Sequence, residues 1–145
     1  MVSKEILTQY SDLQEEVKEV RERIERTEKQ IAKIEEEGTV IDTVSGGSGG
    51  IQHFKIEGFP YPEYGRKKSL LYVRKATLVS LEMELMEMLN QVEKFIASVD
   101  DSRMRRIITL RFNDNLSWIK VAERLGGKST ADSVRMEFNR FMGKK

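Results

Sequence analysis

The side chains of this sequence that are best suited to binding chemistry lie on and around a predicted last helix. Arg135 and Arg140 can donate hydrogen bonds to guanine edges or to phosphates, and Asn139 can pair with adenine. Backbone N–H groups at the start of that helix favour a phosphate. The candidate DNA-contacting residues are Lys120, Lys128, Ser129, Thr130, Asp132, Ser133, Arg135, Met136, Asn139 and Arg140.

The charge of the chain is unevenly distributed, although its 25 Lys and Arg nearly balance its 24 Asp and Glu. Residues 1–37 hold 7 basic and 11 acidic side chains, net −4, whereas residues 100–145 hold 11 basic and 6 acidic ones, net +5. This asymmetry predicts an anionic partner, double-stranded DNA, for the basic end; a solvated charged face is the alternative. Four further arginines would contact phosphates or face the acidic first helix: Arg103, Arg105, Arg106 and Arg111.

The composition argues against catalysis. The chain has no Cys and one His, which excludes disulfide frameworks, Cys-ligated zinc and thiol catalysis. No nucleophile with a base and no metal-ligand spacing is present, so we predict no enzyme activity, no cofactor and no metal. There is no apolar run of about 18 residues and no secretory signal, so we expect no membrane association and a cytoplasmic location in a bacterial host cell.

A helix-turn-helix domain over residues 100–145 would position the candidate side chains. The pattern predicts a helix over 103–112, a turn at 113–115, a short helix over 118–125 and a last helix over 131–142. Two helices joined by a tight turn, after a preceding helix, are typical of a helix-turn-helix module. A three-helix packing unit that does not bind DNA is the alternative.

Capping and packing residues support these three helices. Asp100 and Asp101, beside Ser102, are expected to form the N-cap of the first helix, and Ser117 is expected to cap the second. Gly126 and Gly127 are expected to end the second helix. Trp118 is expected to pack rather than to stack on bases. The inward row of the last helix is Ala131, Val134, Phe138 and Phe141.

Two long heptad helices are predicted to precede this domain, within residues 1–99. No Gly or Pro lies between Lys4 and Glu37, and apolar positions recur there in alternating steps of four and three, as in a coiled-coil seam. We expect Gly38 to end this helix. The seam consists of Ile6, Tyr10, Leu13, Val17, Val20, Ile24, Thr27, Ile31 and Ile34, with Thr27 as its polar exception.

A second seam with the same spacing follows from about Glu63, and Lys67 and Arg74 weaken its first half. Two such seams predict an antiparallel hairpin, or alternatively a parallel dimer in which each helix pairs with its copy. We also expect self-association through the coiled coil. The second seam runs through Tyr64, Lys67, Leu71, Arg74, Leu78, Leu81, Leu85, Met88, Val92, Phe95 and Val99. A further row broadens the apolar face and predicts contact with more than one neighbour; it includes Leu70, Val73, Met83, Met86, Leu89 and Ile96. Met83, Met86 and Met88 are interpreted as filling gaps in a helical core rather than as an adaptable binding surface.

The connection over 38–65 is predicted to be non-helical, because it holds both prolines and a glycine-rich run. Two β-like runs, 39–44 and 51–56, predict a small β-hairpin with a flexible tip. The glycine-rich run lacks the ending of a phosphate loop, and His53 is expected to be an exposed strand residue. The predicted fold is therefore all-α: a long antiparallel helical hairpin followed by the helix-turn-helix domain.

The C-terminal motifs resemble a known family of DNA-binding modules. The segments Arg105–Phe112 (RRIITLRF) and Leu116–Gly126 (LSWIKVAERLG) are similar to the helix-turn-helix of sigma factor region 4. The pattern is also similar to small phage and prophage proteins of Gram-positive bacteria, including RinA- and ArpU-like late transcription regulators. The match covers about residues 100–142. The resemblance implies only a DNA-binding mode. It does not imply a complete sigma factor, because residues 1–99 are predicted to be mostly coiled coil and leave no room for a domain that recognises the −10 element.

Three functions follow from these observations. The first is a DNA-binding transcription regulator, a phage- or prophage-encoded activator that recognises promoter DNA with its last helix and whose coiled coil dimerises or contacts RNA polymerase. The second is a DNA-packaging phage component similar to a terminase small subunit. The third is a protein-binding scaffold or inhibitor. We favour the first, because the basic charge and the helix-turn-helix pattern coincide in residues 100–145.

Overall fold

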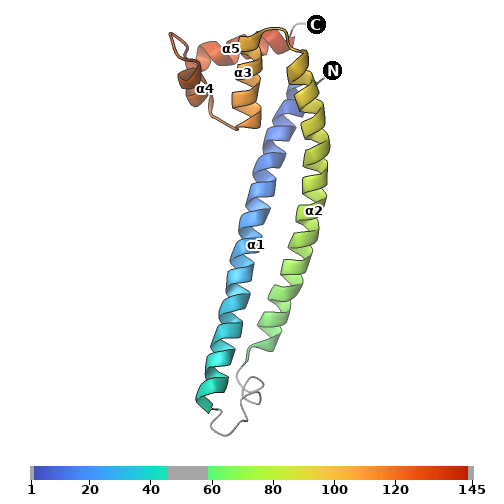
Figure 1. Ribbon diagram of the computed structural model, residues 1–145, viewed down its shortest axis with the longest axis vertical. Coiled ribbons are helices and arrows are strands. Elements are labelled where there is room, and N and C mark those ends of the chain that lie inside the picture. The colour runs from blue at the N-terminus through green and yellow to red at the C-terminus, as the bar shows by residue number, and fades with distance from the viewer. Residues whose placement is uncertain (1, 46–58, 144–145) are drawn as a thin grey trace. The chain divides into compact units, whose positions relative to one another are not determined.

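The computed structural model describes residues 2–45 and 59–143, and every regular element within these ranges is helical (Figure 1). The elements are α1 (Lys4–Ser45), α2 (Tyr61–Ser98), α3 (Ser102–Ile108), a π-helical turn η2 (Thr109–Asn113), α4 (Trp118–Leu125) and α5 (Ala131–Gly143). The predicted all-α class is confirmed for this part of the chain. No helix in it is long and apolar enough to span a bilayer.

Helix α1 is longer than predicted. It runs for 42 residues and continues through Gly38 and through 39–44, where we expected a helix end and a β-strand, so both predictions are wrong. One glycine within a helix costs only about 1 kcal/mol relative to alanine. Each residue that extends an established helix adds a backbone hydrogen bond, which offsets that cost. The second predicted strand, 51–56 with His53, lies outside the described residues, and Gly65 lies within α2.

Contacts divide the chain into two compact units, which we describe one at a time. The first, called here the hairpin unit, is Val17–Ser80. The second, called here the core unit, combines Met1–Glu16 with Leu81–Lys145. Each unit therefore contains a part of α1 and a part of α2, and the core unit also contains α3, α4 and α5.

Within the hairpin unit, α1 and α2 of one chain lie side by side in opposite directions (Figure 1). Residues that come later in α2 contact residues that come earlier in α1, as they do when two helices run antiparallel. The antiparallel alternative is therefore confirmed. The polar contacts are Tyr64 Oη to Glu35 (2.7 Å), Lys67 Nζ to Gln30 (3.0 Å), Arg74 Nη1 to Thr27 Oγ1 (2.7 Å) and the Lys75–Glu28 ion pair (3.2 Å).

The polar and charged residues that interrupt the two apolar seams have partners on the opposite helix. Thr27 is only 2% exposed among the buried apolar residues of its seam, and its hydroxyl accepts a hydrogen bond from Arg74 while it donates to the carbonyl of Arg23. Lys67, the other charged residue of the α2 seam, donates to Gln30. Because a buried polar group needs a partner, these pairs favour this register over a slipped one.

The core unit has one hydrophobic core that is shared by the beginning of α1, the end of α2 and the three C-terminal helices. Leu7, Ile107 and Val134 are fully buried in it, although they come from distant parts of the sequence. The buried members of this core are Val2, Leu7, Tyr10, Val92, Phe95, Val99, Met104, Ile107, Ile108, Phe112, Val121, Ala122, Val134 and Phe138.

Polar contacts also join the beginning of α1 to the turn that follows η2. The Tyr10 hydroxyl donates to Asn113 Oδ1 at 2.7 Å, and Asn115 Nδ2 donates to Glu15 at 2.9 Å. The Ser11 hydroxyl donates to Asn115 Oδ1. Asn115 has a φ of 54°, a left-handed conformation that asparagine tolerates better than most residues. The predicted turn is therefore present, and it contacts α1.

The helix predicted over 103–112 begins one residue earlier than expected and changes its form before its expected end. Asp101, one of the two aspartates predicted to cap it, is the N-cap, and its carboxylate accepts a hydrogen bond from the Arg103 N–H at 3.3 Å. The α-helical hydrogen bonding ends with α3, and the chain continues as η2. The Asp114 N–H closes that wider turn by donating to the Thr109 carbonyl at 2.9 Å.

The further apolar row of α2 is only partly buried. Leu89 and Ile96 pack against the shared core, as expected of core residues. Met83 and Met86 are instead exposed, as are Leu70 and Val73. The interpretation as gap-filling core is therefore wrong for Met83 and Met86, whereas Met88 packs against the shared core as expected.

We expect Thr27→Val to lower the free energy of unfolding, because the Arg74 guanidinium then loses an acceptor within the seam. A hydrogen bond to a charged group contributes about 1.5–3 kcal/mol, and a loss of this size should appear in urea titrations followed by circular dichroism. Combining Thr27→Val with Arg74→Met should recover most of the loss, since no unpaired polar group remains. Lys29→Met, which removes the exposed Lys29–Glu25 ion pair, is the control and should cost less than about 1 kcal/mol. A double variant less stable than Thr27→Val would contradict this account.

We expect Tyr10 to make stability fall at alkaline pH. Burial raises the pKa of the Tyr10 hydroxyl above its ordinary value of 10.0, and the negative charge of Glu93 acts in the same direction. The folded state thus holds this proton more tightly than the unfolded state. The resulting stabilisation is complete below the unfolded pKa and is lost as the pH rises through the folded one. Tyr10→Phe should remove this part of the alkaline loss in denaturant titrations between about pH 9 and 11. An alkaline loss of stability that is as large in Tyr10→Phe as in the native chain would contradict this account.

Candidate nucleic-acid interface

Helix α4 has the predicted bounds and both predicted caps. The Ser117 hydroxyl accepts a hydrogen bond from the Lys120 N–H at 3.3 Å, which satisfies one of the unpaired N–H groups of the first turn. At the other end, the Gly126 N–H donates to the Ala122 carbonyl at 3.0 Å. Gly126 and Gly127 both have positive φ, so the chain reverses toward α5 within a few residues.

Helix α5 begins with a reciprocal cap. The Ser133 N–H donates to Thr130 Oγ1 at 3.1 Å, and the Thr130 N–H donates to Ser133 Oγ at 2.9 Å. Ser129 Oγ, one residue earlier, accepts a hydrogen bond from Arg103 at 3.2 Å. Three of the candidate DNA-contacting hydroxyls therefore have structural partners, and the Thr130–Ser133 pair fixes the start of α5.

Aromatic packing holds α5 against α4 and η2. The Phe138 ring lies 5.1 Å from that of Phe112 and 5.7 Å from that of Trp118, between ring centroids. Val134, one turn earlier, is fully buried, and Ala122 of α4 is buried as well. Trp118 is thus a packing residue, as expected. These contacts turn the opposite face of α5 outward.

The outward face of α5 carries the polar and basic side chains that were predicted to lie there. Arg135, Met136 and Arg140 are exposed. Asp132 is exposed too, and it pairs with Arg135 at 3.5 Å. Asn139 is only half-exposed, and its Oδ1 accepts a hydrogen bond from Lys4 Nζ of α1 at 3.1 Å.

The ten predicted site residues fall into two groups. Members of the first group have exposed side chains, of which Asp132 and Arg135 pair with each other: Lys120, Lys128, Asp132, Arg135, Met136 and Arg140. Members of the second group form hydrogen bonds that fix the start of α5 or join it to another helix, although Thr130 and Ser133 are also exposed: Ser129, Thr130, Ser133 and Asn139.

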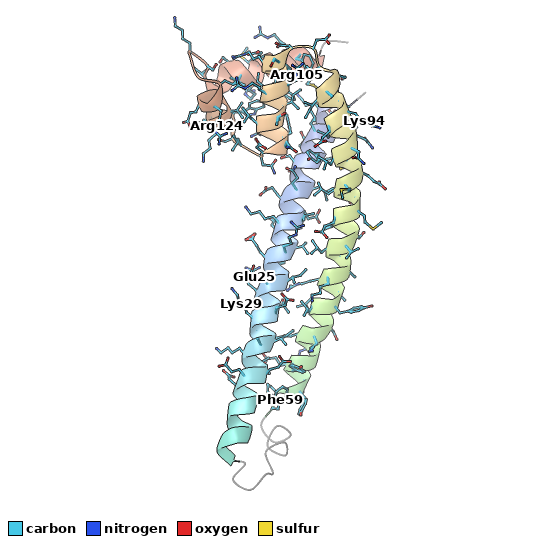
Figure 2. The ribbon with its side chains drawn as sticks, viewed as in Figure 1. Glu25, Lys29, Phe59, Lys94, Arg105 and Arg124 are labelled. Carbon is cyan, nitrogen blue, oxygen red and sulfur yellow. The ribbon has the colours of Figure 1, made fainter. Side chains whose placement is uncertain are left out.

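The four arginines of α3 and η2 have structural partners in the core unit. Arg103 pairs with Glu137 of α5 at 3.0 Å. Arg111 donates to the Leu116 carbonyl at 3.0 Å, and its guanidinium lies 4.8 Å from the Trp118 ring. The other two bond to backbone carbonyls: Arg105 to Val99 and Asp100, and Arg106 to Arg124. Figure 2 labels Arg105 on α3 and Arg124 on α4. These partners are neither of the two that we expected for this set.

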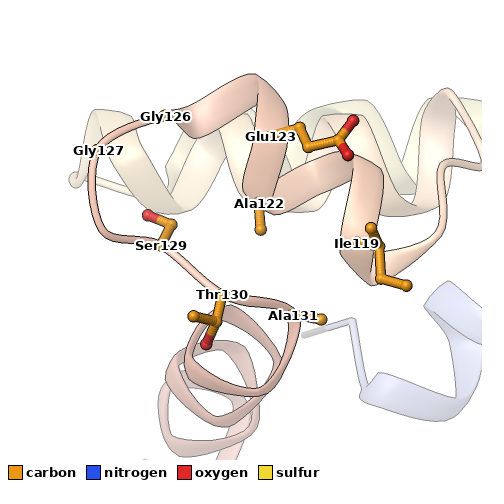
Figure 3. Close-up of a pocket in the computed structure, with 8 residues that line it drawn as sticks. All are labelled: Ile119, Ala122, Glu123, Gly126, Gly127, Ser129, Thr130 and Ala131. Atoms are coloured by element: carbon orange, nitrogen blue, oxygen red, sulfur yellow. The ribbon is translucent and has the colours of Figure 1, made fainter.

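A hollow of about 390 Å³ lies between α4 and the turn that leads to α5 (Figure 3). Small residues and one carboxylate line it, and the Ala122 side chain points into it. Among the described residues, no group of three His, Cys, Asp or Glu side chains could hold a metal ion. The hollow is lined by Ile119, Ala122, Glu123, Gly126, Gly127, Ser129, Thr130 and Ala131.

Two residues near this surface were not identified from the sequence. Ile119 is 63% exposed on α4, beside Lys120. The sequence did contain a signal for this exposure, because Ile119 does not share the helical spacing of the inward-facing residues Val121 and Ala122. Lys4 brings a positive charge from α1 to Asn139, and the sequence held no signal for a contact across 135 positions.

No family model, curated protein or solved structure matches this chain. The geometry of the core unit is therefore the main evidence for what the surface does.

We expect the turn between α4 and α5 to depend on Gly126 more than on Gly127. Gly126 has φ 75° and ψ −165°, a region that is essentially restricted to glycine, whereas Gly127 has φ 64°. A Cβ at either position meets no neighbouring atom, so any cost comes from the backbone. Gly126→Ala should lower the free energy of unfolding by about 1–3 kcal/mol. Gly127→Asn, the matched control, should cost much less, because asparagine tolerates the left-handed region. Equal losses in urea titrations would contradict this reading.

Proposed function

We propose that α4, the turn and α5 form a helix-turn-helix that binds double-stranded DNA, with α5 in the major groove. One observation carries the proposal: Arg135, Met136 and Arg140 are exposed on the face of α5 opposite its buried row. Arginine side chains in a major groove can donate two hydrogen bonds to guanine, and an apolar side chain can contact the methyl group of thymine. The buried row anchors α5, so its outward face is available to bases.

Exposed cations beside α5 support the same proposal. Lys120 lies in the first turn of α4, and Lys128 lies in the connection that precedes α5. Lysines in such places suit the phosphates that flank a groove, and phosphate contacts orient a protein on the duplex. Lys4 adds a third cation from α1, close to Asn139. Because Lys4 is exposed, its side chain can move to a phosphate and release Asn139 to bind adenine.

The biological role that we propose is transcription regulation by a phage- or prophage-encoded activator in the bacterial cytoplasm. It rests on the resemblance of residues 105–126 to sigma factor region 4 and to RinA- and ArpU-like regulators. RNA polymerase is then a natural second partner. No catalytic role, metal or cofactor is part of this proposal. Promoter fragments, rather than packaging sites, should be enriched when the full chain captures fragments of host and phage DNA.

We expect the full chain to bind a duplex selected from a random library, measured by fluorescence anisotropy at several salt concentrations. The slope of log K against log salt should be about −0.9 for each phosphate contacted. Arg135→Ala should cost about 1–3 kcal/mol and relax the preference at one base pair. Lys128→Ala should weaken binding to all sequences alike and reduce the salt slope by about one.

Lys29→Ala is the matched control, because Lys29 is a highly exposed lysine of α1 within the hairpin unit. It should leave both affinity and salt slope unchanged. No binding at low salt would overturn the proposal. Equal effects of the Lys29 and Lys128 substitutions would show that binding follows overall charge rather than this surface.

A further inference from the structure

Helix α2 carries a second apolar stripe that lies apart from its seam with α1. Its four largest side chains are well exposed: Tyr72 by 79%, Val79 by 57%, Met83 by 66% and Met86 by 63%. Ala76, which completes the spacing, is exposed as well. A soluble protein rarely leaves so many neighbouring large apolar side chains in water unless they contact a partner.

The spacing of the stripe points to a helix as that partner. Its positions are 72, 76, 79, 83 and 86, which alternate steps of four and three as a heptad seam does. They lie on one backbone, because α2 is continuous from Tyr61 to Ser98. At 3.6 residues per turn they fall roughly opposite the seam positions 71, 74, 78, 81 and 85. Helix α2 can therefore contact α1 on one side and another helix on the other.

Charges beside the stripe select the direction of that second helix. Lys68 and Lys75 flank its N-terminal half, and Glu82 and Glu87 flank its C-terminal half. Lys75, which pairs with Glu28, still has 56% of its side chain exposed. The stripe has Val79 at its centre. Two antiparallel copies of α2 centred there would bring the lysines of each copy close to the glutamates of the other, whereas a parallel pair would oppose like charges.

We propose that α2 pairs with α2 of a second copy of this chain, antiparallel and about a two-fold axis at Val79. The interface is isologous, so Tyr72 of each copy faces Met86 of the other. It differs from the parallel dimer considered from the sequence, because the α1–α2 seam stays within each chain. It does not depend on DNA binding.

The absence of native cysteines allows a direct test by disulfide cross-linking of the full chain. Under mild oxidation, Val79→Cys should form a covalent dimer, because the two thiols meet near the axis. Tyr72→Cys should not cross-link to itself, but it should cross-link to Met86→Cys when the two variants are mixed. Self-cross-linking of Tyr72→Cys would overturn the antiparallel arrangement, and so would the failure of Val79→Cys to cross-link.

Sedimentation of the unoxidised protein supplies a second test. Val79→Lys, which places two like charges at the axis, should weaken dimerisation by at least ~100-fold. Val73→Lys is the matched control, since Val73 is equally exposed at 59% on the same helix but lies off the stripe. It should leave the dimer intact, and circular dichroism should show both variants folded. A monomeric native chain, or equal effects of the two substitutions, would overturn the proposal.

Discussion

The core unit depends on the burial of the first turns of α1 against helices that come about a hundred residues later. Leu7 is fully buried and Tyr10 nearly so, in the same core as Val134 and Phe138 of α5. Three short helices alone enclose little apolar surface, so the ends of the two long helices supply much of what they lack. The orientation of α5 therefore depends on residues outside α3–α5. The same packing places Lys4 of α1 within hydrogen-bonding distance of Asn139.

The features that could be predicted from the sequence are those that local interactions determine. The caps at Ser117 and Gly126 each bond to a backbone group within four residues, so sequence spacing was enough to identify them. The heptad seams repeat the same local pattern. Most of the α1 seam is buried as expected, whereas the α2 seam is buried at Val92, Phe95 and Val99 and half-buried elsewhere. The end of α1 was missed because Gly38 is only a weak local signal, whereas helix propagation through 39–44 depends on the helix already formed before it.

The features that could not be predicted depend on partners distant in sequence. The net charge of +5 suggested a broad cationic surface, but Arg103 and Arg111 bond within the core unit and contribute less to it than a charge count assumes. Thr27 and Arg74 are each a polar interruption of an apolar seam. Their hydrogen bond depends on the register in which α1 packs against α2, which the sequence of either helix alone does not give. The two apolar rows of α2 likewise gave no sign of which one α1 covers, so Met83 was assigned to the core.

The two proposals constrain each other through symmetry. An isologous α2 pair relates every element of the two copies by one two-fold axis, including both copies of α5. Two recognition helices related in that way contact half-sites that form an inverted repeat. A duplex selected by the full chain should then be palindromic if the dimer is the form that binds DNA. If both proposals hold, the asymmetry of charge along α2, which favours the antiparallel pair, also favours an inverted repeat in the DNA site, although Lys68 and Glu87 need not contact DNA.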